Sequence, residues 1–138
     1  MDTDAEHDSE KYQTDSGMWR LFVYARLKRP GMEDNASIEG DLRRLGNGDL
    51  AARFGGQATD GFAKPHVVRI WGQVIHVDDK ALKNLDRLEG SGKFRYERVA
   101  IKTAGGVHAY AFQYVGNLKD GDDFAQLPKV TSTWDPSR

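Results

Sequence analysis

Glu89 is the first residue whose position could support catalysis, because it lies in the last turn of a helix that we predict over residues 78–89. The helix dipole disfavours a carboxylate at this end by about 0.3–1 kcal/mol, which increases its affinity for a proton. If the side chain also points into a poorly hydrated pocket, desolvation acts in the same direction. Glu89 is therefore a candidate general acid/base, and the alternative is a solvated glutamate in front of Gly90.

The second candidate site is the segment from Tyr24 to Leu27, which follows a predicted strand. Backbone N–H groups that lose their strand partners can bind a carboxylate or a developing oxyanion. Tyr24 adds a phenol, and Trp71 and Tyr96 are candidates to line a pocket. The alternative is a set of core aromatic residues at strand ends followed by a charged loop.

Other chemistries have little support in the sequence. The chain has no Cys, which excludes thiolate nucleophiles, disulfides and sulfur-bound zinc. Its four His residues are scattered, with no pair at helical spacing, so we predict no metal site. The glycine pairs lack the Lys-Ser/Thr of a phosphate loop, and none of the Ser residues lies in a nucleophile-elbow motif. We therefore expect no cofactor.

Length and charge indicate one soluble domain with a distinct terminus. The chain has 138 residues, 20 of them Lys or Arg and 21 Asp or Glu. Residues 1–16 contain six of the acidic residues and one basic residue, so we predict a disordered acidic tail over residues 1–17. The mildly basic remainder lacks the basic stripe of a nucleic-acid binder, and no apolar run is long enough to span a membrane. We expect a cytoplasmic protein.

The elements that must position the candidate residues follow from the apolar pattern. We predict strands over residues 18–24, 67–77, 96–102 and 107–115, a helix over residues 78–89, a turn at residues 46–48, and loops over residues 28–37 and 55–65. Asp78 is the expected N-cap, and the helix places its apolar residues on one face. Gly72 marks a bulge or a close backbone approach. Together these elements favour an α+β domain with a strongly curved or partly closed sheet.

Four segments resemble a known family in their order and spacing. They are Val23-Tyr24-Ala25-Arg26-Leu27-Lys28-Arg29, Ile70-Trp71-Gly72-Gln73-Val74-Ile75, Leu85-Asp86-Arg87-Leu88-Glu89-Gly90 and Tyr96-Glu97-Arg98-Val99. The chain is similar, from about residue 19 to residue 115, to the γ-glutamylcyclotransferase-like family, which includes γ-glutamylamine cyclotransferases and plant avirulence-induced-gene-like proteins. This resemblance implies a small barrel-like mixed sheet with flanking helices over residues 18–127 and an irregular end over residues 128–138.

The resemblance also implies an activity, the release of 5-oxoproline from a γ-glutamyl amine or a related conjugate. It makes Glu89 the general acid/base and the segment Tyr24, Ala25, Arg26 and Leu27 the substrate cradle, with Tyr96 as a further substrate-binding residue. The substrate's own α-amine attacks its γ-carbonyl, so neither a metal nor a cofactor is implied.

The cradle departs from the family pattern, which usually reads Tyr-Gly-Ser/Thr-Leu. If the family geometry needs a positive φ at the glycine, Ala25 costs about 1 kcal/mol or forces a different turn. Arg26 replaces a small hydroxyl residue and either fills the pocket or holds an anion. Two alternatives therefore stay open: a non-cyclotransferase that binds or processes another anionic, phosphate-bearing or similar small molecule through Arg26, and an interaction module that acts through residues 1–16.

Overall fold

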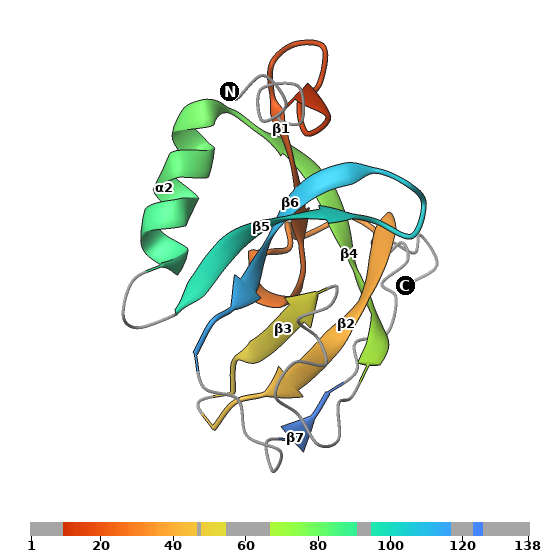
Figure 1. Cartoon of the computed structure of the whole chain (residues 1–138), viewed down its shortest axis with the longest axis vertical. Helices are drawn as coiled ribbons and strands as arrows, with labels where there is room; N and C mark the ends of the chain where they lie inside the picture. Colours follow the sequence, from red (N-terminus) through yellow and green to blue (C-terminus); the bar gives the residue numbers. More distant parts are fainter. Residues whose placement is uncertain (1–9, 47, 55–66, 91–94, 117–122, 126–138) are drawn as a thin grey trace, which may run out of the picture.

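The computed structural model describes residues 10–46, 48–54, 67–90, 95–116 and 123–125. Its elements, in chain order, are β1 (Trp19–Val23), the 3-10 turn η1 (Ala25–Leu27), β2 (Ala36–Arg44), β3 (Leu50–Phe54), β4 (Val67–Val77), α2 (Asp79–Glu89), β5 (Tyr96–Lys102), β6 (His108–Tyr114) and the short β7 (Asp123–Phe124) (Figure 1). The predicted strands and helix are confirmed. Residues 38–54, whose sequence pattern is ambiguous apart from the predicted turn at residues 46–48, contain the antiparallel pairing of β2 with β3.

The strands form one mixed, strongly curved sheet in the order β3-β2-β4-β1-β6-β5, with β7 beside β2. Strands β1 and β6 run parallel, and the other neighbours along this order are antiparallel. Side chains connect the two edges: Tyr96 Oη of β5 donates to the Leu50 carbonyl of β3 at 2.8 Å, and Arg53 Nη2 of β3 donates to the Gly116 carbonyl after β6 at 2.8 Å. The expected α+β, barrel-like fold is confirmed; the described residues contain one α-helix instead of several.

Strand β1 separates two apolar clusters because its successive side chains point to opposite faces. Phe22 contacts the cluster inside the curved sheet, and Leu21 and Val23 contact the cluster beneath α2, to which Leu82 belongs. Burial on both faces explains why Leu21, Phe22 and Val23 form a continuous apolar run in this strand. Packing on both faces therefore holds the end of β1 in place directly before the candidate cradle.

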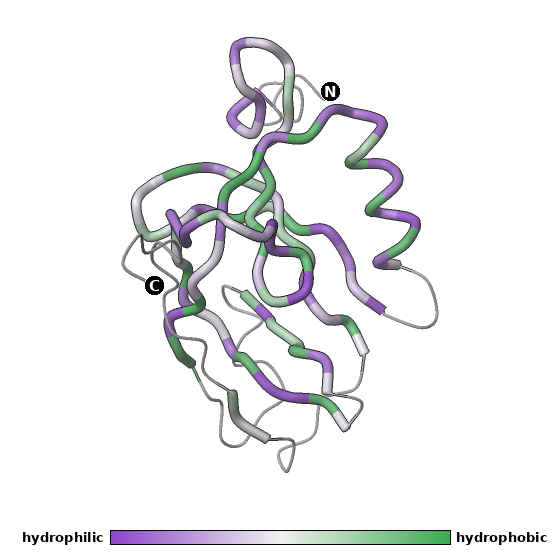
Figure 2. The backbone as a smooth tube through the Cα atoms, turned by 180° about the vertical axis from the view of Figure 1, so that it is seen from behind, coloured by the Kyte–Doolittle hydropathy of each residue, from purple (hydrophilic) through white to green (hydrophobic). Residues whose placement is uncertain are grey.

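Helix α2 packs on one side of the sheet and brings Glu89 to its end (Figure 1). Asp78 accepts a hydrogen bond from the Ala81 N–H at 2.7 Å, which confirms the expected N-cap. Hydrophilic residues predominate along the helix, and hydrophobic ones recur about once per turn (Figure 2). No helix among the described residues is long and apolar enough to cross a membrane.

Gly72 of β4 confirms the expected close approach of two backbones. A Cβ at this position would clash with the Val23 carbonyl oxygen, and it would lie 2.9 Å from the Phe22 ring. Only glycine therefore lets β4 pair so closely with the end of β1.

The described chain begins before β1. Residues 10–17 were expected to belong to the disordered tail, but Gln13 forms a β-bridge with Trp19, and the Tyr12 ring stacks on Tyr110 at 4.8 Å. Aromatic packing stabilises this segment against the sheet. The other residues of the expected tail (1–9), the predicted loop at residues 55–65 and the irregular end at residues 128–138 lie outside the described residues.

Candidate functional site

The backbone after β1 turns sharply at the expected place. Tyr24 is still extended, with φ −139° and ψ 163°, whereas Ala25 has a φ of 53° and begins the turn η1. The left-handed conformation considered for Ala25 is therefore present. Two amides of this segment do not point to a ligand, because Leu27 N–H donates to the Tyr24 carbonyl and Lys28 N–H to the Ala25 carbonyl. This corrects the expectation of a fully unpaired amide cradle.

Gln73 holds the next part of this loop. Its side chain is completely buried and faces Val23 in the β1–β4 register. Its Oε1 accepts the Arg29 N–H at 2.8 Å, and its Nε2 donates to the Arg29 carbonyl at 3.0 Å and to the Met32 carbonyl at 3.3 Å. One amide thus satisfies three backbone groups where the chain leaves the sheet. The sequence gives no signal for this role beyond a polar residue in an apolar strand.

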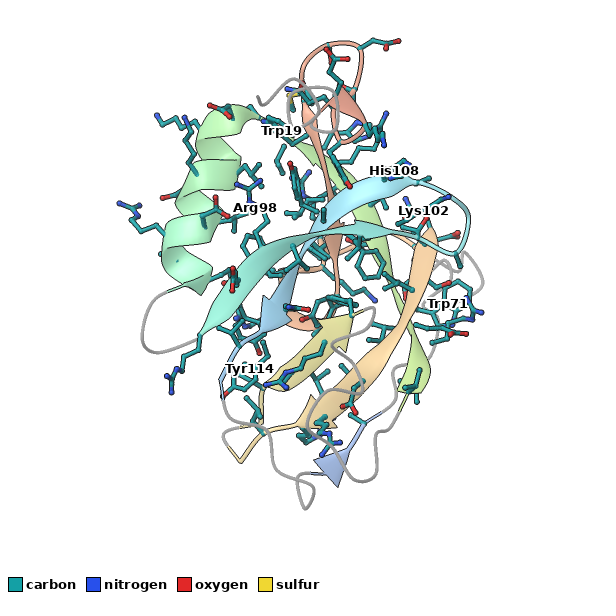
Figure 3. All side chains as sticks on the ribbon, in the orientation of Figure 1. Trp19, Trp71, Arg98, Lys102, His108 and Tyr114 are labelled. Atoms are coloured by element: carbon teal, nitrogen blue, oxygen red, sulfur yellow. The ribbon has the colours of Figure 1, made fainter. Side chains whose placement is uncertain are left out.

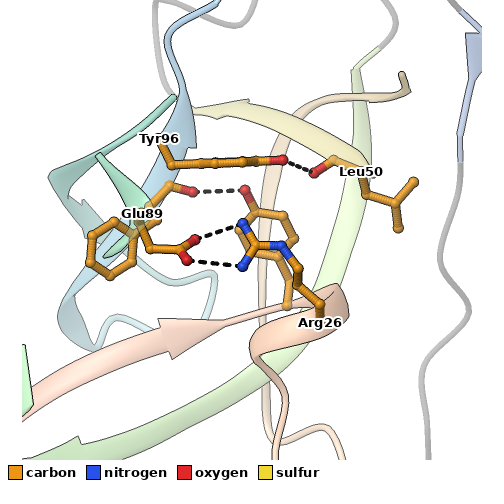
Figure 4. Close-up of polar contacts among 6 residues, drawn as sticks. Arg26, Leu50, Glu89 and Tyr96 are labelled. Carbon is orange, nitrogen blue, oxygen red and sulfur yellow. Dashed lines mark hydrogen bonds and ion pairs between the residues drawn. The ribbon is translucent and has the colours of Figure 1, made fainter. Parts of the chain in front are cut away.

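Glu89 is 3% exposed, and both of its carboxylate oxygens are occupied. Arg26 Nη1 donates to Oε2 at 2.9 Å and Nη2 to Oε1 at 2.9 Å, a bidentate ion pair (Figure 4). Burial beside the candidate cradle agrees with the sequence analysis. Of the two alternatives considered for Arg26, the structure has its guanidinium directly in front of the Glu89 carboxylate.

Arg26 lies between Glu89 and an aromatic face. Its guanidinium carbon is 5.1 Å from the centroid of the Tyr96 ring, within the range of a cation–π contact. Partial burial lowers the pKa of Arg26, but the hydrogen bonds and negative charge of Glu89 outweigh it and raise this pKa overall. The side chain of Arg26 is 36% exposed and that of Glu89 4%, so water reaches the cation much more easily than the anion.

The two tyrosines of the site are buried phenols that bond to backbone carbonyls. Tyr24 Oη donates to the Phe112 carbonyl at 2.7 Å, and Tyr96 Oη to the Leu50 carbonyl at 2.8 Å (Figure 4). Burial raises the pKa of Tyr24 well above its ordinary value and the pKa of Tyr96 to about 12. Both side chains are therefore neutral near pH 7 and act here as fixed walls of the site.

A pocket of about 280 Å³ brings together Glu89, Tyr96 and the segment 24–27, whereas Trp71, the other candidate, is not part of its lining. Its lining consists of Tyr24, Ala25, Arg26, Leu27, Arg44, Gly48, Asp49, Leu50, Glu89, Tyr96 and Phe112. This volume lies near the lower end of the range for small-molecule sites, about 300 Å³. The end of β2 contributes Arg44 and the following turn contributes Asp49, and the sequence analysis missed both. Their only signal is that two charged residues flank a glycine-rich turn.

A second bidentate ion pair fixes the end of α2. Arg98 Nε donates to Asp86 Oδ1 at 2.8 Å and Nη2 to Oδ2 at 3.0 Å, which links the last helical turn to β5. Arg98 lies between the sheet and the helix (Figure 3) and stacks over the Tyr110 ring at 4.5 Å. Asp86 precedes Glu89 by less than one turn, so this pair restricts where the Glu89 carboxylate can lie. Asp86 and Arg98 belong to two of the four segments on which the resemblance is based, and this ion pair joins those two segments.

Comparison with known proteins agrees with this geometry. No group of three or more potential metal-binding side chains occurs in the part of the chain that the structure describes. Neither the curated proteins nor the solved structures contain a match to the chain. The family model described as "Gamma-glutamyl cyclotransferase, AIG2-like" matches residues 21–135, which include the strand exit, the helix end and β5. The chain therefore belongs to the AIG2-like γ-glutamyl cyclotransferase family.

Proposed function

We propose that this protein is a cyclotransferase that releases 5-oxoproline from a small γ-glutamyl amine. Family membership supports a γ-glutamyl cyclotransferase-like function. The single observation that carries the finer proposal is a carboxylate, Glu89, buried in the wall of a pocket that the strand exit helps to build. The pocket volume of about 280 Å³ favours a small leaving amine.

In the proposed reaction Glu89 accepts a proton from the substrate's α-ammonium group. The neutral α-nitrogen then attacks the γ-carbonyl carbon, and a new C–N bond closes a five-membered ring. Glu89 returns the proton to the leaving nitrogen, and the original amide C–N bond breaks. The ring nitrogen loses its second proton through the Glu89 carboxylate to the departing amine, so that 5-oxoproline and a protonated amine result. Ring closure needs no second reactant, so positioning alone can supply several kcal/mol of the barrier. A buried carboxylate is well placed to transfer a proton in both directions.

The second candidate function is the binding of an anionic small molecule through Arg26. It is favoured by one observation, the partly exposed guanidinium in the pocket lining. A purely anionic ligand that drew Arg26 away would leave the buried Glu89 carboxylate without this partner, at a cost of about 1–3 kcal/mol. The cyclotransferase reaction is the better supported of the two, because its substrate offers Glu89 a replacement cation.

Replacing Glu89 tests the proposal directly. We expect the full-length protein to release 5-oxoproline from at least one member of a panel of γ-glutamyl amines, γ-glutamyl dipeptides and glutathione. Glu89→Gln should lower this rate at least about a hundredfold, because the amide cannot accept the α-ammonium proton. The same substitution at the exposed Glu97 is the matched control and should leave the rate unchanged. A Glu89→Gln protein that keeps its fold and its rate would remove Glu89 from the mechanism.

A further inference from the structure

The two partners of the ion pair between Arg26 and Glu89 differ in their access to water. Each Glu89 oxygen accepts one guanidinium N–H at 2.9 Å, so a ligand cation must compete with Arg26 for this carboxylate. The side chain of Arg26 is 36% exposed, whereas that of Glu89 is 4% exposed. Water can solvate the released cation, but not the released anion.

This difference in exposure predicts that ligand affinity depends on which charged groups the ligand carries. A ligand with only an anionic group pairs with Arg26 and leaves the buried Glu89 carboxylate without its cation. An amine alone satisfies Glu89 but brings no anion of its own for the displaced guanidinium, which keeps the weaker attraction of Asp49 in the pocket lining. A ligand with an ammonium and a carboxylate group on the same carbon gives Glu89 a cation and Arg26 an anion in one step. The planar guanidinium can form the same two-point contact with the ligand carboxylate that it forms with Glu89.

We propose that Arg26 is a specificity-determining residue, which exchanges Glu89 for the α-carboxylate of the ligand when an α-amino acid head group binds. The identity of the reacting ligand rests on the proposed function, whereas the charge exchange does not. The Tyr96 ring, 5.1 Å from the guanidinium carbon, provides a surface along which the guanidinium can shift without losing its aromatic contact. The side chain at position 26 thereby selects ligands that carry both charges.

Three matched probes that cannot form 5-oxoproline separate the charges: L-norvaline carries both groups, butylamine lacks the carboxylate and pentanoate lacks the amine. We expect NMR titration of the intact protein to show L-norvaline binding at least about tenfold more tightly than either of the others. In Arg26→Ala the preference for L-norvaline over butylamine should fall to about one. Arg26→Lys, which keeps the charge but not the planar fork, should give an intermediate preference. Arg29→Ala removes an exposed cation three residues away and is the control.

The outcomes separate this inference from the proposed function. If Arg26→Lys and Arg26→Ala keep the full preference for L-norvaline, Arg26 does not bind the α-carboxylate of the ligand, whether or not 5-oxoproline is released. Pentanoate binding as tightly as L-norvaline, or no L-norvaline binding at millimolar concentration, would also overturn the inference. If the preference changes as expected but no γ-glutamyl compound yields 5-oxoproline, the charge exchange stands and the cyclotransferase proposal fails.

Discussion

Ala25 has a backbone conformation that favours glycine, and this leads to a stability prediction. Its φ of 53° costs a residue with a Cβ about 1–2 kcal/mol. Ala25→Gly removes this strain but gives the unfolded chain more freedom, worth about 0.5–1 kcal/mol. We therefore expect a net gain of about 0.5 kcal/mol in the free energy of unfolding, measured by urea denaturation.

The control for this prediction is Ala104→Gly in the β5–β6 turn. Ala104 is exposed and is not among the described residues with a positive φ. Only the unfolded-state effect should operate there, so this variant should lose about 0.5–1 kcal/mol. Equal losses in the two variants would show that the turn at position 25 is not strained.

Which residues gather at the site was predictable, but how they pair was not. The resemblance to the family implied one site for Glu89 and the segment 24–27, and one pocket is lined by all of these residues. The bidentate contact between Arg26 and Glu89 depends on the rotamer of a long side chain and on the aromatic face beside it. Such contacts are set by tertiary packing across 63 residues of sequence, for which local spacing gives no signal.

At the scale of elements, the pair Asp86–Arg98 should matter for turnover because it holds the end of α2 against β5. Asp86→Asn weakens one charge-assisted contact and lets the last helical turn shift. We expect a loss of about 0.5–1 kcal/mol in stability and a lower kcat for 5-oxoproline release, because small displacements of a proton-transfer group slow its reaction. Steady-state kinetics well below the unfolding transition measure the second effect.

Lys83→Gln is the matched control on the same helix. The Lys83–Asp79 pair lies within α2, and its side chains are 74% and 63% exposed, so its loss should cost no more than about 0.5 kcal/mol and leave kcat unchanged. If Asp86→Asn also leaves kcat unchanged, the ion pair stabilises the helix without positioning Glu89.

The pairing of β1 with β4 depends on Gly72. Because a Cβ there meets the Val23 carbonyl and the Phe22 ring, Gly72→Ala must push backbone atoms apart. We expect a loss of at least about 2 kcal/mol, or no folded protein, by urea denaturation. Gly46→Ala, where nothing lies within 4 Å of the added Cβ, should change stability by less than about 0.5 kcal/mol. Equal effects at the two positions would contradict the close approach.

Elements with a strong period or cap were predictable, whereas strands β2 and β3 were not. The Asp78 cap and the apolar face identified α2, and branched residues identified β4. Strands β2 and β3 were ambiguous because their residues include charges, such as Asp41 and Arg43, that are fully buried in the folded protein. A buried ion pair within one strand breaks the alternation on which strand prediction relies.

At the scale of the whole molecule, side-chain hydrogen bonds connect strands of the curved sheet that are not neighbours in the backbone pairing. The Tyr96 phenol joins the two edge strands of the sheet order, and the Arg53 side chain bonds to the Tyr114 and Gly116 carbonyls. Tyr96 also provides the aromatic face beneath Arg26. The same side chain therefore closes the curved sheet and forms one wall of the pocket, so changes that loosen the sheet should also disturb the site.

This double role predicts a loss of stability at alkaline pH. Burial raises the pKa of Tyr96 from 10.0 to about 12 and also raises the pKa of Tyr24 well above its ordinary value. Above pH 10 the unfolded chain releases phenol protons that the folded protein retains, so the free energy of unfolding falls as pH rises. For Tyr96 this fall should extend from about pH 10 to about pH 12, and below about pH 10 its contribution is fully present. Tyr96→Phe should be less stable at pH 8, because the Leu50 carbonyl loses its donor, yet show a shallower decline between about pH 10 and 12 in urea denaturation. A Tyr96→Phe protein with the same alkaline slope as the parent would show that this phenol is ionised equally easily in both states.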